Sequence, residues 1–162
     1  MRVLIISDSH GDRRYMDEAI ERTKPALICH MGDALGDDIH IQAMGECPLR
    51  IVRGNCDMDP SLSNFIEFEL EGHQILMAHG HTFGGGSESI EREMKKKAME
   101  DGCDIIMYGH THVPVIREEK DCTFLNPGSI SRPRQDGGRH TYIVLDITEN
   151  KNFIYNLCSI EK

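Results

Sequence analysis

The feature of this sequence that most limits its fold is a series of short apolar runs, each followed at once by polar residues. The runs are rich in Ile, Leu and Val and are bounded by Gly, Asp and Asn, a pattern typical of buried strands rather than helices. In α/β proteins, side chains placed just beyond the carboxyl ends of strands converge on one crevice. We therefore expect an α/β fold with a polar site at one edge. The runs cover residues 3–6, 27–29, 49–52, 75–78 and 105–108.

The residues that follow these runs are mainly of types that bind metal ions. Oxygen and imidazole ligands without thiolate suit Mn²⁺, Fe, Ni²⁺ or Zn²⁺, and two such ions roughly 3.5–4 Å apart can hydrolyse a phosphate ester. Within two segments the ligand types lie two residues apart, so an extended chain would place each pair on one face. The repetition predicts a two-metal hydrolytic site. The segments are Asp8-Ser9-His10, Gly32-Asp33, Gly54-Asn55, His79-Gly80-His81 and Gly109-His110-Thr111-His112.

Helical segments alternate with the first strands. Asp12 can cap a helix that Pro25 closes, a weaker amphipathic segment covers residues 38–44, and a third helix runs from Ser87 or Ser89 to Asp101. Residues 65–70 and 73–78 flank a two-residue connection and predict a hairpin. The second half is expected to be rich in strands, at 114–117, 123–125, 141–147 and 153–157.

Size and charge limit the classes of partner. With 162 residues, the chain is most simply one domain, 1–162. Its net charge of −9 would repel duplex nucleic acid and an anionic membrane surface. No apolar stretch approaches the ~20 residues of a membrane span, so we expect a cytoplasmic protein. The six cysteines include no C-x-x-C pair and are expected to be reduced thiols.

The ordered motifs resemble the metallophosphoesterase superfamily, also called calcineurin-like phosphoesterases, and in particular its small prokaryotic YfcE-like phosphodiesterase branch. Gly54-Asn55-Cys56-Asp57 and Asn126-Pro127-Gly128-Ser129 also fit that branch. The resemblance implies two mixed β-sheets packed as a sandwich and flanked by helices. It implies one metal held by Asp8, His10, Asp33 and His112, and a second held by Asp33, Asn55, His79 and His110.

The resemblance also implies roles in catalysis. Asp33 would bridge two divalent cations, with Mn²⁺ the first choice and Ni²⁺, Fe²⁺ or Zn²⁺ as alternatives, and a bridging hydroxide would attack the phosphorus. Asn55 would be a neutral ligand that preserves the positive charge of the centre. His81 is expected either to face the substrate or support the ligands, or to have a purely structural role. Asp57 would orient Asn55 or His10. Cys56 stands where many relatives have a histidine, and a neutral thiol is a poorer proton donor to the leaving group.

Three functions follow as hypotheses. The first is hydrolysis of a small phosphodiester, and the second is a phosphomonoesterase activity. The third is a binding module like the retromer subunit of this fold, with a vestigial metal site. The branch tends to form homodimers or higher oligomers. Arg132 and Arg134 are placed to contact a substrate phosphate, a subunit partner or only solvent.

Overall fold

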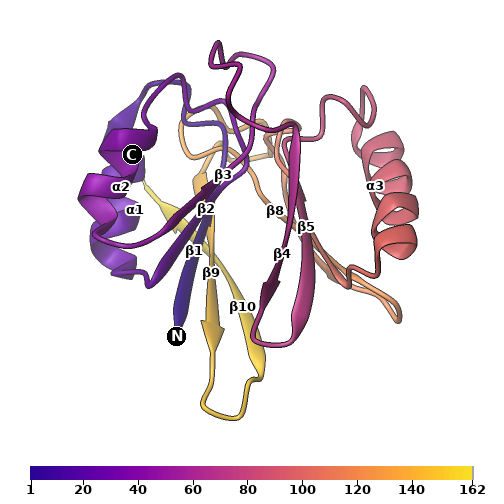
Figure 1. Cartoon of the computed structure of the whole chain (residues 1–162). Coiled ribbons are helices and arrows are strands. Elements are labelled where there is room, and N and C mark those ends of the chain that lie inside the picture. Colours follow the sequence, from indigo (N-terminus) through magenta and orange to yellow (C-terminus); the bar gives the residue numbers. More distant parts are fainter. Residues whose placement is uncertain (162) are drawn as a thin grey trace.

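The computed structural model describes residues 1–161 and contains two five-stranded β-sheets that face each other, with helices on both outer faces (Figure 1). Both sheets are mixed, because each combines parallel and antiparallel pairs. The predicted sandwich of two mixed sheets flanked by helices is confirmed.

The first sheet has the strand order β10-β9-β1-β2-β3. Strands β1, β2 and β3, from the first part of the chain, are parallel to one another, and β9 runs antiparallel to β1. Helices α1 and α2 cover its outer face (Figure 1). The elements are β1 (Arg2–Ile6), α1 (Arg13–Thr23), β2 (Leu27–His30), α2 (Asp38–Gly45), β3 (Leu49–Ile51), β9 (His140–Ile147) and β10 (Phe153–Ile160).

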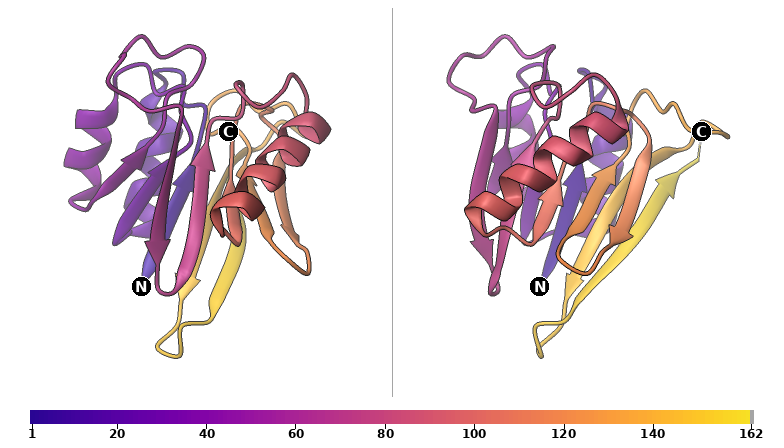
Figure 2. Two further views of the ribbon diagram at one scale, coloured as in Figure 1. Left: turned by 45° about the vertical axis from the view of Figure 1, so that its right-hand side comes forward. Right: turned by 90° about the vertical axis from the view of Figure 1, so that its right-hand side faces the viewer.

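The second sheet has the order β4-β5-β6-β8-β7. The predicted hairpin is its β4–β5 pair, and helix α3 lies across its outer face (Figure 2). The elements are β4 (Phe65–Leu70), β5 (His73–Ala78), α3 (Ser87–Asp101), β6 (Ile105–Met107), β7 (Pro114–Glu118) and β8 (Thr123–Pro127).

The alternation of side chains along β1 explains why its apolar run is continuous. Val3 and Ile5 point between the sheets, whereas Leu4 and Ile6 pack under the helices. A strand with both faces covered needs no polar positions. The same holds for β5 and β6, whose outer residues pack against α3.

Local signals set the helix ends as expected. The Asp12 side chain accepts a hydrogen bond from the Arg14 amide, and Gly102 ends α3 in the left-handed conformation with φ 74°. Two predicted strands end too early: β10 continues to Ile160 instead of residue 157, and β8 continues through Asn126 and Pro127 instead of stopping at residue 125. In β10, the antiparallel pairing with β9 extends to His140. In β8, the extension has a similar cause. Asn126 and Pro127 are in register with Val115 and Pro114 of β7, and this antiparallel pairing extends the strand.

The loops after β1, β2, β3, β5 and β6 gather at one end of the sandwich, the top of Figure 1. This end carries the segments that the sequence singled out. Within residues 1–161, no helix is both long and apolar enough to cross a membrane.

Candidate metal centre

The loops at this end hold unusual backbone conformations. Five of the seven predicted ligands have positive φ angles, namely Asp8, His10, Asp33, His110 and His112, with values from 47° to 66°. Such angles are uncommon outside glycine, cost free energy and cluster at functional sites. They also correct the expectation of an extended chain at residues 8–10 and 110–112, since tight loops, not extended strands, bring these side chains together.

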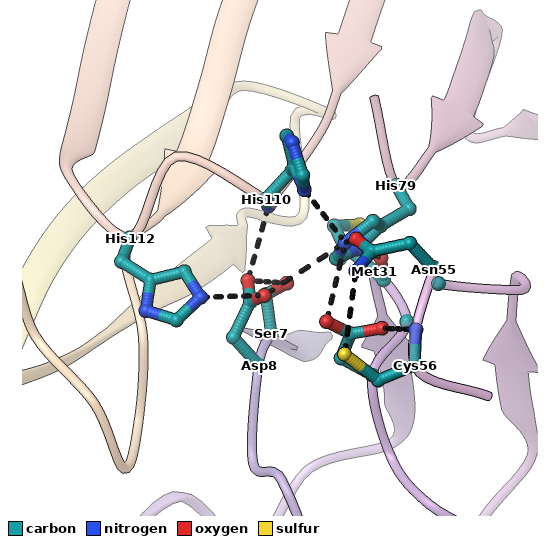
Figure 3. Close-up of polar contacts among 12 residues, drawn as sticks. Ser7, Asp8, Met31, Asn55, Cys56, His79, His110 and His112 are labelled. Atoms are coloured by element: carbon teal, nitrogen blue, oxygen red, sulfur yellow. Dashed lines mark hydrogen bonds and ion pairs between the residues drawn. The ribbon is translucent and has the colours of Figure 1, made fainter. Parts of the chain in front are cut away.

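Asp8 lies at the centre of the first group of side chains (Figure 3). Its Oδ2 atom accepts hydrogen bonds from the Ser7 hydroxyl and the His110 amide, at 2.5 and 3.1 Å. Its Oδ1 atom is buried and accepts none from residues 1–161, but it lies 3.1 Å from Nε2 of His112 and 3.8 Å from Nε2 of His10. Ligand atoms of Asp8, His10 and His112 are thus close enough to share one ion.

Asp33 lies between this group and a second one. Its Oδ1 atom accepts a hydrogen bond of 2.8 Å from the Cys56 amide. Its Oδ2 atom lies 3.7 Å from Nε2 of His10 and 3.5 Å from Nε2 of His79. One carboxylate oxygen therefore faces an imidazole of each group.

His79 is the centre of the second group. Its Nε2 atom lies 3.1 Å from Oδ1 of Asn55 and 3.3 Å from Nδ1 of His110. Asp8, Asp33 and His79 form a further triplet able to share an ion, so Asp8 borders both groups. The structure brings all seven predicted ligands to one place.

Backbone carbonyls fix the orientation of two imidazoles. Nδ1 of His79 donates to the carbonyl oxygen of Met31 at 2.7 Å, and Nδ1 of His112 donates to that of Arg132 at 2.6 Å. A carbonyl oxygen only accepts, so the proton is on Nδ1 and the lone pair on Nε2 points into the centre. This is the arrangement of metal-binding histidines, in which the outer nitrogen is held by a hydrogen bond.

The charge balance of the centre fits divalent cations. Asp8 and Asp33 are both buried, and within residues 1–161 neither has a Lys or Arg ion-pair partner. Burial raises the pKa of Asp8, but its contacts with His112 and His79 outweigh this and the net pKa is lowered. Burial lowers the pKa values of His10 and His110, which favours neutral imidazoles. Buried charges need partners, and Oδ1 of Asp8 has no hydrogen-bond donor in the part of the chain that the structure describes.

Asp57 has a different position from the one expected. Instead of contacting Asn55 or His10, its buried carboxylate accepts hydrogen bonds from the backbone amides of Asp33, Leu35 and Gly54, at 2.8, 2.8 and 2.7 Å. Backbone amides are better placed than those side chains because both loops turn their N–H groups inward. Asp57 therefore joins the loop after β2 to the loop after β3.

Cys56 and the two arginines lie at the edge of the centre. They line a hollow of about 340 Å³ at the candidate ligands. The Cys56 thiol is close enough to His10 and Asp33 to share an ion with them, although burial and the Asp33 charge raise its pKa and keep it neutral. The lining residues are His10, Asp33, Asn55, Cys56, His110, His112, Arg132 and Arg134.

His81 lies next to two of the predicted ligands, His79 and His110. Its ring centroid lies 5.4 Å from that of His79 and 6.3 Å from that of His110. Its Nδ1 atom is buried and has no hydrogen-bond partner among the residues described. His81 is thus beside the predicted ligands, while the residues named above line the hollow.

The Asn126-Pro127-Gly128-Ser129 segment, singled out in the sequence by its motif, lies against the ligand loops, together with Ser131, which no motif indicated. Ser129 and Ser131 both donate to the carbonyl oxygen of Asp8, at 2.8 and 2.9 Å. Asn126 donates to the carbonyl oxygen of Gly109 at 3.1 Å, so the Asn-Pro-Gly-Ser segment holds the ligand loops by hydrogen bonds.

Glycine is needed next to two predicted ligands. A Cβ atom on Gly54 would lie 2.0 Å from Oδ1 of Asp33, and one on Gly109 would lie 2.1 Å from the Ser7 hydroxyl oxygen. The Gly-Asn and Gly-His pairs therefore reflect close packing of neighbouring loops.

The comparisons with known proteins agree on one family. Residues 1–150 match the calcineurin-like phosphoesterase superfamily domain. A probable metallophosphoesterase of Methanothermobacter thermautotrophicus is 33% identical over 141 residues, which cover 83% of this chain and 80% of the relative. The phosphodiesterase YfcE of Escherichia coli K12 is 33% identical in an alignment that covers 90% of this chain and 88% of the relative.

Solved structures share the fold. A predicted phosphoesterase from Streptococcus pneumoniae superposes with a TM-score of 0.76 at 28% identity, covering 98% of this chain and 97% of that one. Vps29 from Entamoeba histolytica, solved with zinc, gives 0.76 at 19% identity, covering 98% and 99%. The second likeness shows the shared fold alone.

Proposed function

The chain belongs to the calcineurin-like phosphoesterase superfamily of metal-dependent hydrolases, and from this we propose that it is a phosphodiesterase that acts on a small phosphodiester with two divalent cations. The observation that carries the two-cation proposal is the position of Asp33. Its Oδ2 atom lies within 3.7 Å of His10 Nε2 and within 3.5 Å of His79 Nε2. Such a carboxylate can bind two ions at once.

The other ligands divide between the two cations. Asp8, His10 and His112 would hold one with Asp33, and Asn55, His79 and His110 would hold the other with Asp33. Bound cations would lower the pKa of a water molecule and neutralise charge on the phosphate. Asp33, His79 and His112 are held by the hydrogen bonds of Cys56, Met31 and Arg132 before any ion binds, so little reorganisation is needed.

The charge of the loaded site favours an anionic substrate. Two divalent ions bring four positive charges, whereas Asp8 and Asp33 bring two negative ones. Asn55 is neutral and leaves this surplus intact, and Arg132 and Arg134 line the same hollow. A phosphate is thus attracted locally although the whole chain carries −9.

Cys56 favours diesters with good leaving groups. Its neutral thiol supplies no positive charge near the departing oxygen. The diesterase proposal has further support from a relative named a phosphodiesterase. The monoesterase remains the second enzyme hypothesis. A binding module with a vestigial site is less well supported, since all seven ligand types are present and gathered at one site.

The test is hydrolysis of bis-p-nitrophenyl phosphate and p-nitrophenyl phosphate after reconstitution with Mn²⁺. We expect faster turnover of the diester, and a loss of at least about a thousandfold in kcat/KM for Asp33→Asn, about 4 kcal/mol. Met99→Ala, at an exposed position of α3, is the control. Faster monoester turnover would favour the monoesterase, and tight Mn²⁺ binding without turnover of either ester would favour the binding module.

A further inference from the structure

We propose that a second hollow, next to the candidate metal centre, binds one ester group of the substrate, an uncharged and apolar group about the size of one ring. This inference rests on the proposed phosphodiesterase function and adds a substrate class to it. The hollow lies between the loop after β2 and the loop after β3, with Leu35, Met58 and Leu62 among its lining residues.

The second hollow and the hollow of the metal centre share one lining residue. Cys56 lines both hollows. Its amide donates to Oδ1 of Asp33 at 2.8 Å, which fixes Cys56 beside the carboxylate that faces both histidine groups. A phosphodiester bound at the centre can therefore extend one ester group past Cys56 into this hollow.

The walls of the hollow are fixed before binding. Asp57 accepts hydrogen bonds from Asp33 and Leu35 in the loop that forms one wall and from Gly54 in the loop that forms the other. Because the same buried carboxylate holds both loops, their spacing is set by the fold. A site formed in advance loses little conformational freedom when a ligand enters.

The size and lining of the hollow indicate the chemistry of the group. Its volume is about 190 Å³, and an apolar cavity of ~150 Å³ is enough to bind benzene. Leu35, Ile51, Met58 and Leu62 supply apolar surface. Leu35 and Met58 are 46% and 89% exposed, so a ligand ring would cover apolar surface that now faces water.

Charge at the hollow excludes a second anionic group. The carboxylates of Asp38 and Asp59 also line it, and they would repel a phosphate or carboxylate carried on the ester group. In a polynucleotide every diester has charged neighbours on both sides. The hollow therefore favours a small diester with an uncharged group on this side.

The experiment compares two non-hydrolysed ligands, phenylphosphonate and methylphosphonate, on the zinc-loaded full chain. Binding is followed by methyl NMR, with the Met58, Leu35 and Leu62 signals as local reporters. We expect phenylphosphonate to bind about tenfold tighter and to shift these methyl signals through the ring. The Leu35→Ala/Met58→Ala double variant should lose most of this preference, and Met99→Ala should keep it.

A charged ligand completes the test. 4-Carboxyphenylphosphonate should bind more weakly than phenylphosphonate, and Asp38→Asn/Asp59→Asn should reduce the difference. Equal affinities for the phenyl and methyl ligands, or a phenyl preference that survives the double variant, would overturn the proposal. Zinc binding and phenyl preference without diester turnover would instead contradict only the phosphodiesterase function, so the two failures are distinguishable. Met58→Ala alone, at a mostly exposed position, guards against misfolding of the double variant.

Discussion

Nε2 of His112 lies 3.1 Å from Oδ1 of Asp8, and Nδ1 of the same ring donates to the carbonyl oxygen of Arg132. Without a cation, a proton on Nε2 is the group that can join these two atoms. Burial lowers the pKa of His112, but the close contact with the negatively charged Asp8 carboxylate outweighs burial and the net pKa is raised. A proton and a metal ion therefore compete for one position.

This competition predicts that Mn²⁺ binding releases protons and weakens as the pH falls from about 8 to 5. Since the pKa of His112 in the metal-free folded state exceeds its usual 6.5, the Asp8–His112 pair stabilises the metal-free protein fully below about 6.5 and less as pH rises through the raised pKa. Calorimetry in buffers of different ionisation enthalpy measures the released protons. The His112→Asn variant should release fewer protons when it binds Mn²⁺. Unchanged Mn²⁺ occupancy at pH 5 would contradict a histidine-rich site.

His30 should make the free energy of unfolding depend on pH in the opposite sense to His112, and at lower pH. Its Nδ1 atom accepts from the Gly32 amide at 3.1 Å, so Nε2 carries the proton and faces the Ser9 hydroxyl oxygen at 3.2 Å. Burial lowers the pKa of His30 from 6.5 to about 4, because the charged imidazolium would lose its hydration. A second proton, on Nδ1, would also face the Gly32 N–H. His30 thereby joins the loops that carry Asp8 and Asp33.

The unfolded chain takes up a proton at His30 below about 6.5, whereas the folded chain does so only near 4. The free energy of unfolding of the metal-free protein should therefore fall between pH 6.5 and 4, with a contribution from His30 on the order of 3 kcal/mol. Urea titrations at several pH values measure this slope. His30→Gln should be less stable at pH 7 but should show a shallower slope, and an equal slope would show that His30 is not the group responsible.

Replacing Asp57 should lower both the free energy of unfolding and the affinity for Mn²⁺. Asp57→Asn would turn a donor group toward amides of Asp33, Leu35 and Gly54 that now donate to it. Leaving buried donors unpaired should lower the free energy of unfolding by about 3 kcal/mol and weaken Mn²⁺ binding by loosening Asp33. Urea unfolding and calorimetry check both. Asp59→Asn is the matched control in the same loop, because Asp59 is exposed and its hydrogen bond is to Ser61.

Strands and ligands were predictable because both depend on residue type. Continuous apolar runs indicate strands covered on two faces, and carboxylates and imidazoles after them indicate a metal centre. The supporting contacts of Met31 and Arg132 use backbone carbonyls, which any residue provides, so no side-chain pattern reveals them. The role of Asp57 depends on the turns of two loops with positive φ at Asp33 and Leu35, and these conformations arise from tertiary packing rather than local preference.

Cys56 gives the sharpest prediction about the leaving group. Its thiol lines the hollow of the metal centre, and burial and Asp33 keep its pKa above the ordinary value. It is therefore neutral near pH 7 and gives little help to a departing alkoxide.

A Cys56→His variant would place an imidazole there, able to donate a proton or supply positive charge. We expect kcat/KM for a diester with an alkyl leaving group to rise by about tenfold or more, since general acid catalysis contributes ~10²-fold when well positioned. The rate for a p-nitrophenyl leaving group should change little, because p-nitrophenolate departs without a proton. Cys56→Ser is the control for loss of the thiol. Equal gains for both leaving groups would show that the histidine acts on binding or on the metal centre instead of on the departing oxygen.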